Sequence, residues 1–146
     1  DVYKRQILQS IYIKFKQNHP YHLPMSKTNE DTGLIDAIVE SIRERKGRRI
    51  TRVDLSRINS TPAANFIICE GTSSTQVGAI ADNVREQLQI RNGVKPYGYD
   101  GYEASQWIVI DYGDTLVHVF QPDTRMRYNL EDLWSDAQTT EYPELD

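Results

Sequence analysis

Residues 107–120, WIVIDYGDTLVHVF, constrain the fold more strongly than any other stretch of this chain. Two apolar runs flank a turn at Gly113, a residue type that readily adopts the positive φ found in tight hairpin turns. The pattern therefore predicts a β-hairpin. If its loop has two or four residues, one face of the hairpin carries only core residues, namely Ile108, Ile110, Val117 and Val119.

The opposite face of the predicted hairpin is harder to assign. In the same register it carries Trp107, Val109, Asp111, Leu116, His118 and Phe120. If a helix covers this face, Asp111 and His118 need buried hydrogen-bond partners, because an unsatisfied buried polar group costs about 1–3 kcal/mol. If the face meets solvent, its aromatic side chains resemble an interaction patch. A covered core face, a docking face and a catalytic acid/base pair all stay open from these residues alone.

Helical spacing of apolar residues predicts two long helices. The first runs from about Thr32 to Lys46 and ends at Gly47. The second begins at a cap formed by Ser73 or Ser74 and extends to about Gln89. The residues expected to face the core are Leu34, Ile35, Ile38, Val39 and Ile42 in the first helix, and Val77, Ile80, Ala81, Val84 and Leu88 in the second.

The remaining segments complete an α/β or α+β domain. Alternating apolar residues predict a strand at residues 50–56, and the continuous apolar run at residues 65–71 is typical of a strand in the centre of a sheet. Residues 129–137 predict a short helix capped by Asn129, with a break in the chain before it at Pro122. This order of elements indicates a mixed β-sheet flanked by helices.

The domain is expected to occupy residues 25–138. Residues 1–24 show no clean helical period and end in a Pro- and His-rich break, so we expect them to be a translated leader or an artefact outside the fold. A signal peptide is the competing interpretation, but Lys14 and Lys16 interrupt its apolar region. Residues 139–146 are polar and acidic and are expected to form a flexible tail.

Cysteine usage and charge narrow the class of protein. Cys69 is the only cysteine, which excludes an internal disulfide and a cysteine-based zinc site and favours a reducing, cytoplasmic compartment. The net charge is −4 at pH 7, and from Asp100 onward only Arg125 and Arg127 are basic. This half of the chain would repel nucleic-acid phosphates and suits a basic partner. The basic stretch at residues 43–52 leaves a minor RNA contact open, although a solvated helix end is the plainer interpretation.

The sequence contains no complete catalytic constellation. The turn at residues 71–74 lacks the lysine of a phosphate-binding P-loop and the full glycine pattern of a dinucleotide site. Asp111 and Asp114 flank a turn, whereas a nucleotidyltransferase needs two acids on one strand to hold Mg²⁺. His118 has no nucleophile at a recognisable spacing. A divergent nucleotidyl- or phosphotransferase that uses this turn and these two acids is therefore the less favoured alternative.

Three segments together resemble one known family. They are LIDAIVESIRERKG, NFIICEGTSSTQVGAIADNV and WIVIDYGDTLVHVFQPDTRMRYNLEDLW, and they occur in this order over nearly all of residues 32–137. This combination is similar to the ribosomal silencing factor (RsfS) family, also called the Iojap-related family. The resemblance implies a mixed-sheet α/β fold like that of nucleotidyltransferases but without their active site, with no cofactor and no metal.

The resemblance also implies a function. Members are expected to bind the large ribosomal subunit through ribosomal protein L-fourteen and to block joining of the small subunit, which lowers translation when nutrients are scarce. The implied role is that of a cytoplasmic translational repressor, not an enzyme. The implied partner-binding residues are Asp100, Gly101, Glu103, Trp107, Asp111, Tyr112, Asp114 and His118, and Leu133-Trp134 also matches the family pattern.

Some features depart from the family pattern or stay open. Asp100 stands where many members have glutamate, which keeps the charge, and Asn65 stands where many have aspartate, which removes one. A homodimer of the free protein is compatible with the sequence. So is a homodimeric scaffold unrelated to ribosomes.

Overall fold

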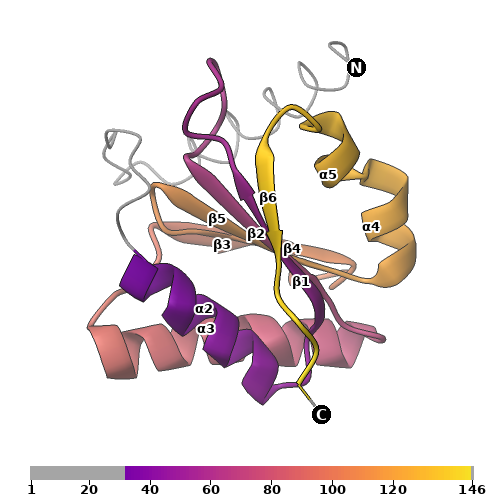
Figure 1. Ribbon diagram of the computed structural model, residues 1–146. Coiled ribbons are helices and arrows are strands. Elements are labelled where there is room, and N and C mark those ends of the chain that lie inside the picture. The colour runs from indigo at the N-terminus through magenta and orange to yellow at the C-terminus, as the bar shows by residue number, and fades with distance from the viewer. Residues whose placement is uncertain (1–31, 146) are drawn as a thin grey trace.

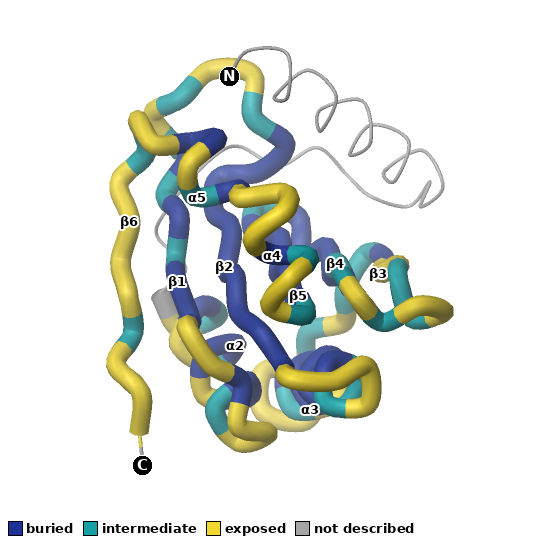
Figure 2. Tube along the Cα trace, turned by 90° about the vertical axis from the view of Figure 1, so that its right-hand side faces the viewer, coloured by how far each residue is buried: buried dark blue, intermediate teal, exposed yellow. Residues whose placement is uncertain are grey.

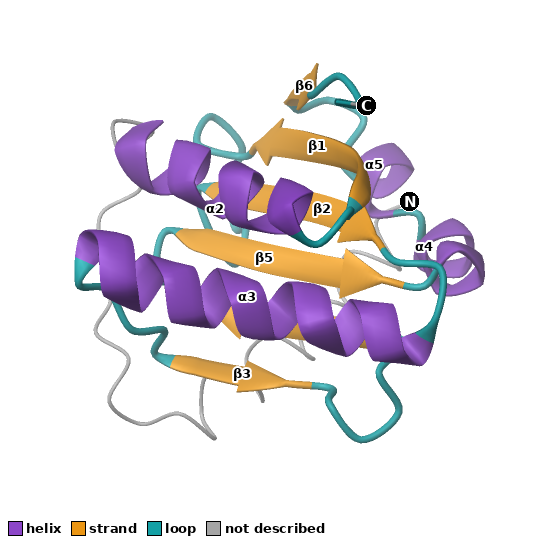
Figure 3. Ribbon diagram, turned by 90° about the horizontal axis from the view of Figure 1, so that it is seen from below, coloured by secondary structure: helices purple, strands orange, loops and turns teal. Residues whose placement is uncertain are grey.

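The computed structural model describes residues 32–145, which form one mixed sheet with helices on both faces (Figure 1). The expected leader at residues 1–24 therefore lies outside the described residues. The strands are β1 (Arg48–Asp54), β2 (Asn65–Glu70), β3 (Gly98–Asp100), β4 (Trp107–Asp111), β5 (Thr115–Phe120) and β6 (Gln138–Glu141). They lie in the order β3-β4-β5-β2-β1-β6, and Figure 3 shows the sheet from β6 at the top to β3 at the bottom, with β4 largely hidden. The predicted mixed-sheet class is confirmed.

The centre of the sheet is a parallel pair. β2 and β5 run parallel, with Asn65 beside Thr115 and Glu70 beside Phe120, and every other neighbouring pair is antiparallel. All residues of both strands are buried. The continuous apolar run was correctly predicted to be a central strand, because a strand with elements packed on both faces has no solvent-facing side to make polar.

Two long helices cover one face of the sheet, α2 (Thr32–Glu44) and α3 (Ser74–Asn92) (Figure 3). The side chain of Ser73 accepts a hydrogen bond from the N–H of Gln76, which confirms the predicted N-terminal cap of α3. Helix α3 extends past the predicted end to Asn92, where Gly93 takes the left-handed conformation at φ 65°. No helix among residues 32–145 combines the length and apolar character needed to cross a membrane.

The inward residues of both helices are almost all as predicted. The buried members of this core include Ile35, Ile38, Val39 and Ile42 from α2, and Val77, Ile80, Ala81, Val84 and Leu88 from α3, whereas Leu34 packs at its margin. Gly47 follows α2, but it is Lys46 that takes the positive φ, at 63°. Gly47 is required for a different reason, since a Cβ there would overlap the side chain of Ile42.

The other face carries two short helices, α4 (Pro122–Tyr128) and α5 (Leu130–Leu133) (Figures 1 and 2). The expected break at Pro122 is wrong, because proline there occupies the first turn of α4, where its missing N–H costs no helical hydrogen bond. The single helix expected over residues 129–137 is also shorter. Asn129 makes no side-chain cap and instead links α4 to α5 in a left-handed conformation, with φ at 47°.

Residues 138–143 do not form a loose tail. Residues 138–141 form β6, which pairs antiparallel with β1 at the edge of the sheet (Figure 2). Beyond the strand, the N–H of Tyr142 donates to the carbonyl of Ile50 at 2.9 Å. The guanidinium of Arg43 donates to the carbonyl of Pro143 at 2.9 Å. The expected flexible tail from Thr139 is therefore corrected, since pairing with β1 orders a segment that has no apolar pattern of its own.

Candidate functional site

The predicted hairpin forms with the predicted register. Ile108 pairs with Val119 and Ile110 with Val117, so all four lie on the face under α2 and α3. The N–H of Tyr112 donates to the carbonyl of Thr115 at 2.9 Å, which closes a tight turn at Gly113. Gly113 has a φ of 89°, as such a turn requires.

The second face of the hairpin is covered by α4 and α5, so of the alternatives that the sequence left open the covered core face is the one that forms. His118 is fully buried, with its ring 4.6 Å from that of Phe66, and Phe66 in turn packs edge-on against Trp134 of the α5 end at 5.2 Å. Leu130, Leu133 and Trp134 fill the space between the short helices and the sheet. The Leu133-Trp134 pair therefore lies in the core.

Trp107 lies at the margin of this second core and is half-buried. Its indole N–H donates to Nδ1 of His118 at 3.0 Å. Its ring stacks on Phe120 at 5.0 Å and lies 4.7 Å from the ring of Tyr128 on α4. Burial lowers the pKa of His118 to about 3, so the imidazole is neutral and its Nδ1 can accept this bond. Trp107 is thereby fixed between the sheet and α4.

Three of the eight predicted partner-binding residues cannot contact a partner directly in this structure. Asp111, Tyr112 and His118 are 0%, 5% and 0% exposed. One carboxylate oxygen of Asp111 accepts the N–H of Gly113 at 2.8 Å, which supports the turn. Burial raises the pKa of the Tyr112 hydroxyl, so it stays protonated. The expectation of direct contact is corrected for these residues, because the register and the covering helices turn their side chains inward. A supporting role for them stays a prediction.

Four of the other predicted residues meet in one surface groove of about 520 Å³. Asp100, Gly101, Glu103 and Trp107 line it from the β3–β4 connection, and α4 supplies the opposite wall. The fifth, Asp114, lies at the hairpin turn, at the far end of β4 from Trp107. The groove was not predicted as such, and it also includes Tyr99, Tyr102, Thr124, Arg127 and Tyr128.

The β3–β4 connection is a compact turn that needs Gly101. Gly101 has a φ of 106°, and a Cβ at this position would overlap the carbonyl oxygen of Trp107. The N–H of Ser105 donates to the carbonyl of Gly101 at 3.0 Å, and its hydroxyl donates to the carbonyl of Tyr102 at 2.8 Å. These bonds hold Asp100 and Glu103, both exposed, on a fixed loop.

Helix α3 holds this loop from behind. The guanidinium carbon of Arg85 lies 3.6 Å from the ring centroid of Tyr99, and its NH1 donates to the hydroxyl of Tyr102 at 3.3 Å. Burial is the main cause that raises the pKa of Tyr102 to about 12. Tyr102 therefore stays a neutral hydrogen-bond partner, and Tyr99 remains 41% exposed beside the groove.

The groove combines aromatic walls with mixed charge. Tyr99 and Tyr128 are 41% and 37% exposed, and Trp107 forms part of its surface. Asp100 and Glu103 are acidic, whereas Arg127 is the one basic side chain among the lining residues. Exposed aromatic rings beside carboxylates are typical of protein-binding surfaces, where rings supply affinity and charges select the partner.

The wall formed by α4 was missed from the sequence. Pro122 could have indicated this helix, because proline is frequent at the first position of a helix.

The catalytic alternative has no assembled site in this structure. The turn at residues 71–74 follows the end of β2, whereas Asp111 and Asp114 flank the start of β5. Because β2 and β5 run parallel in register, the two features lie at opposite ends of the sheet, about 17 Å apart. A backbone N–H of the turn that could bind a phosphate is already used, since the N–H of Thr72 donates to Oε1 of Gln76 at 2.7 Å. Within residues 32–145, no three His, Cys, Asp or Glu side chains are grouped to bind a metal.

Comparisons with known proteins agree on one family. The model of the family described as "Ribosomal silencing factor during starvation" matches residues 27–146. "Ribosomal silencing factor RsfS" of Halalkalibacterium halodurans is 39% identical over 108 residues, which cover 74% of this chain and 91% of that protein. The protein of the same name from Haemophilus influenzae is 39% identical over 102 residues, which cover 70% of this chain and 98% of its own.

A solved structure shows the same fold. The crystal structure of a protein from Chromobacterium violaceum is 33% identical in sequence and superimposes with a TM-score of 0.68. The match covers 73% of this chain and 87% of that one. The two proteins are therefore similar both in fold and in sequence.

Proposed function

Because the chain belongs to the ribosomal silencing factor family, we propose that it associates with ribosomes and represses translation by occupying the large subunit. In this proposal it binds through ribosomal protein L-fourteen and blocks joining of the small subunit, which lowers translation when nutrients are scarce. Repression then requires only that the protein stays bound, and no chemical step takes place.

One feature of the structure supports docking at the groove. Asp100, Gly101, Glu103 and Trp107, which the family resemblance implies in partner binding, lie together around a single exposed groove with aromatic walls. The groove is preformed, since Trp107 is fixed by His118 and the loop by Arg85, so little conformational entropy is lost on binding. Its two carboxylates would attract a basic ribosomal protein over a distance.

Co-sedimentation with purified large subunits tests the proposal. Wild-type protein should pellet with large subunits and not with small subunits. Asp100→Lys and Glu103→Lys reverse charges on exposed residues at the groove, and each should weaken binding about tenfold at low salt. The loss should shrink as the salt concentration rises, because screening weakens long-range attraction between exposed charges.

A matched control separates the groove from net charge. Asp36→Lys makes the same charge change on the exposed side of α2, on the other face of the molecule, and should bind as the wild type does. Trp107→Ala should weaken binding by about 2 kcal/mol or more, the scale of an interface hot spot. If Asp36→Lys reduces pelleting as much as Glu103→Lys, or if all variants pellet normally, docking at this groove is wrong.

The step after docking needs a separate measurement. Wild-type protein should lower the yield of joined ribosomes when large and small subunits are mixed and separated by density-gradient sedimentation. Glu103→Lys should restore joining in proportion to its lost binding. Tight binding without any effect on joining would contradict the blocking mechanism while leaving ribosome association intact.

A further inference from the structure

Strand β6 forms the edge of the sheet opposite to the docking groove. The groove lies beside β3 and β4 at one end of the strand order, and β6 is the last strand at the other end. All four residues of β6 are exposed (Figure 2). Among the described residues no strand pairs with its outer side, and the unpaired backbone groups of such an open edge can bind another strand.

The register shows which backbone groups of β6 face outward. The N–H of Tyr142 donates to the carbonyl of Ile50, so the backbone groups of Tyr142 face β1. In an antiparallel ladder, residues that face the partner strand in this way alternate along the strand, so Thr140 and Gln138 also bond to β1. The N–H and C=O groups of Thr139 and Glu141 therefore point away from the sheet, where they could bind the backbone of another strand.

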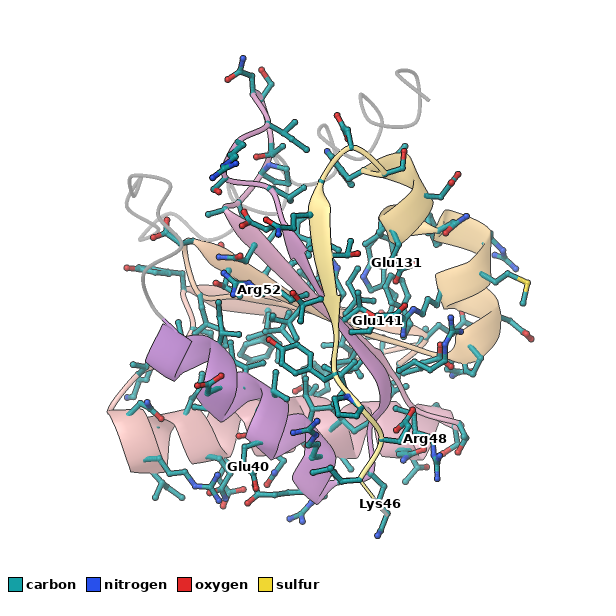
Figure 4. The ribbon with its side chains drawn as sticks, in the orientation of Figure 1. Glu40, Lys46, Arg48, Arg52, Glu131 and Glu141 are labelled. Atoms are coloured by element: carbon teal, nitrogen blue, oxygen red, sulfur yellow. The ribbon has the colours of Figure 1, made fainter. Side chains whose placement is uncertain are left out.

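A groove of about 510 Å³ lies beside this edge, on the face that carries α4 and α5. Thr139 and Glu141 line this groove. Thr139 pairs with Val53 and Glu141 with Thr51, and paired residues point to the same face of a sheet. Since Val53 belongs to the core under α5, both side chains lie on the face that carries the short helices. Glu131 lies on the helical side, and Figure 4 shows Glu131 and Glu141 between β6 and the two short helices. A strand added outside β6 would direct alternate side chains toward this groove.

The charge around the groove is acidic. Its two guanidinium groups already have partners: Arg125 lies 2.8 Å from Oε1 of Glu131, and Arg49 lies 2.9 Å from Oε1 of Glu70. Glu141 is exposed, and its carboxylate has no hydrogen bond or ion pair among the described residues. The groove therefore has a carboxylate available for an additional cation, and no basic group available for an anion.

We propose that the outer edge of β6 binds an extended polypeptide segment with lysine or arginine at alternate positions. The segment adds as a seventh strand, its backbone bonds to Thr139 and Glu141, and its basic side chains lie over Glu141 in the groove. Backbone pairing supplies affinity and the alternate side chains supply selectivity. A second copy of this chain fits less well, because it would bring Glu141 and Glu144 of both copies to the same edge. This surface is separate from the docking groove and does not depend on the proposed ribosomal function.

Peptide binding to purified protein tests this inference. The probe is a fluorescein-labelled peptide of alternating threonine and lysine, and its counterpart with glutamate in place of lysine is the control. Fluorescence anisotropy should show saturable binding of the lysine peptide only. Glu141→Gln should weaken that binding about fivefold, whereas Glu103→Lys in the docking groove should leave it unchanged.

Proline substitutions separate backbone pairing from charge. Thr139→Pro removes an N–H that points outward and leaves the bonds to β1 in place, so the fold should be preserved while peptide affinity falls about tenfold or more. Thr140→Pro removes an N–H that bonds to β1, and it should lower the melting temperature. Far-UV circular dichroism and thermal denaturation check the fold of each variant.

Three outcomes would overturn the proposal. The first is a folded Thr139→Pro variant that binds the lysine peptide as the wild type does. The second is equal binding of the lysine and glutamate peptides. The third is a wild-type dimer in analytical ultracentrifugation that Thr139→Pro converts to a monomer, together with no peptide binding, which would assign the edge to self-association.

Discussion

The two faces of the sheet are built in different ways. One is covered by helices of 13 and 19 residues over a mainly aliphatic core. The other is covered by helices of seven and four residues, and its core contains Phe66, Phe120 and Trp134 around a buried His118. A helix of four residues has little stability by itself. The second face therefore depends on large rings and buried polar contacts, whereas the first depends on helix length.

Arg125 shows how the second face holds its short helices. Its side chain is 5% exposed and donates to Glu131 of the next helix, to the carbonyl of Arg49 and to the hydroxyl of Thr51. It also lies 3.3 Å from Glu70 at the end of β2. One buried side chain thus connects α4 to α5, β1 and β2, whereas the buried Asn83 on the first face links only α3 to α2.

The largest test of this comparison is Trp134→Ala. Trp134 is 2% exposed and packs against Phe66, so its truncation should lower the free energy of unfolding by about 3–5 kcal/mol. Urea denaturation followed by circular dichroism measures the change. Met126→Ala on α4, where the side chain is 76% exposed, should have an effect within about 0.5 kcal/mol. Similar losses in both variants would mean that aromatic packing does not hold this layer.

A smaller loss is expected from Arg125→Met. Methionine fills similar volume but leaves Glu70 and Glu131 without their buried cation, and the expected destabilisation is about 3 kcal/mol. Arg127→Met on the same helix is the control, since Arg127 is exposed. Because α4 forms a wall of the docking groove, Arg125→Met should also weaken ribosome binding in protein that is still folded. Unchanged stability would show that the helices pack without this network.

The smallest effect depends on pH. The pKa of His118 falls from 6.5 in the unfolded chain to about 3 in the folded protein, so only the unfolded chain binds a proton between these values. Stability should therefore be complete above pH 6.5 and decrease as the pH falls. At pH 5 the loss is roughly 2 kcal/mol, since each pH unit contributes about 1.4 kcal/mol.

His118→Gln isolates this contribution. Glutamine does not titrate, and its side-chain oxygen can accept the indole N–H of Trp107. The difference in unfolding free energy between pH 7 and pH 5 should be smaller in the variant than in the wild type. If the pH 7 to pH 5 difference is the same in both proteins, groups other than His118 cause the acid sensitivity. His118 would then not make the second face more sensitive to acid than the first.

The same contrast explains which parts of the fold the sequence predicts. The spacing of Ile35, Ile38, Val77 and Ile80 predicts the first face, because one apolar stripe on each long helix is a local pattern. Strand β6 has no such pattern, and its conformation comes from pairing with β1, whose sequence is far away. The hairpin register was predictable, but whether His118 and Asp111 are covered depends on α4 and α5. The groove likewise requires the β3–β4 connection and α4 together, which sequence spacing does not reveal.

The parallel pairing of β2 and β5 bears on how the protein forms during its own synthesis. Asn65 of β2 pairs with Thr115 of β5, about 50 residues later in the chain. At an elongation rate of roughly 5–20 residues per second, the ribosome needs about 3–10 s to make the intervening segment. During that interval β2, every residue of which is buried in the folded protein, has no central partner and can pair only with β1. A nascent chain of this protein is therefore most exposed to aggregation, and to capture by chaperones, just before its hairpin emerges.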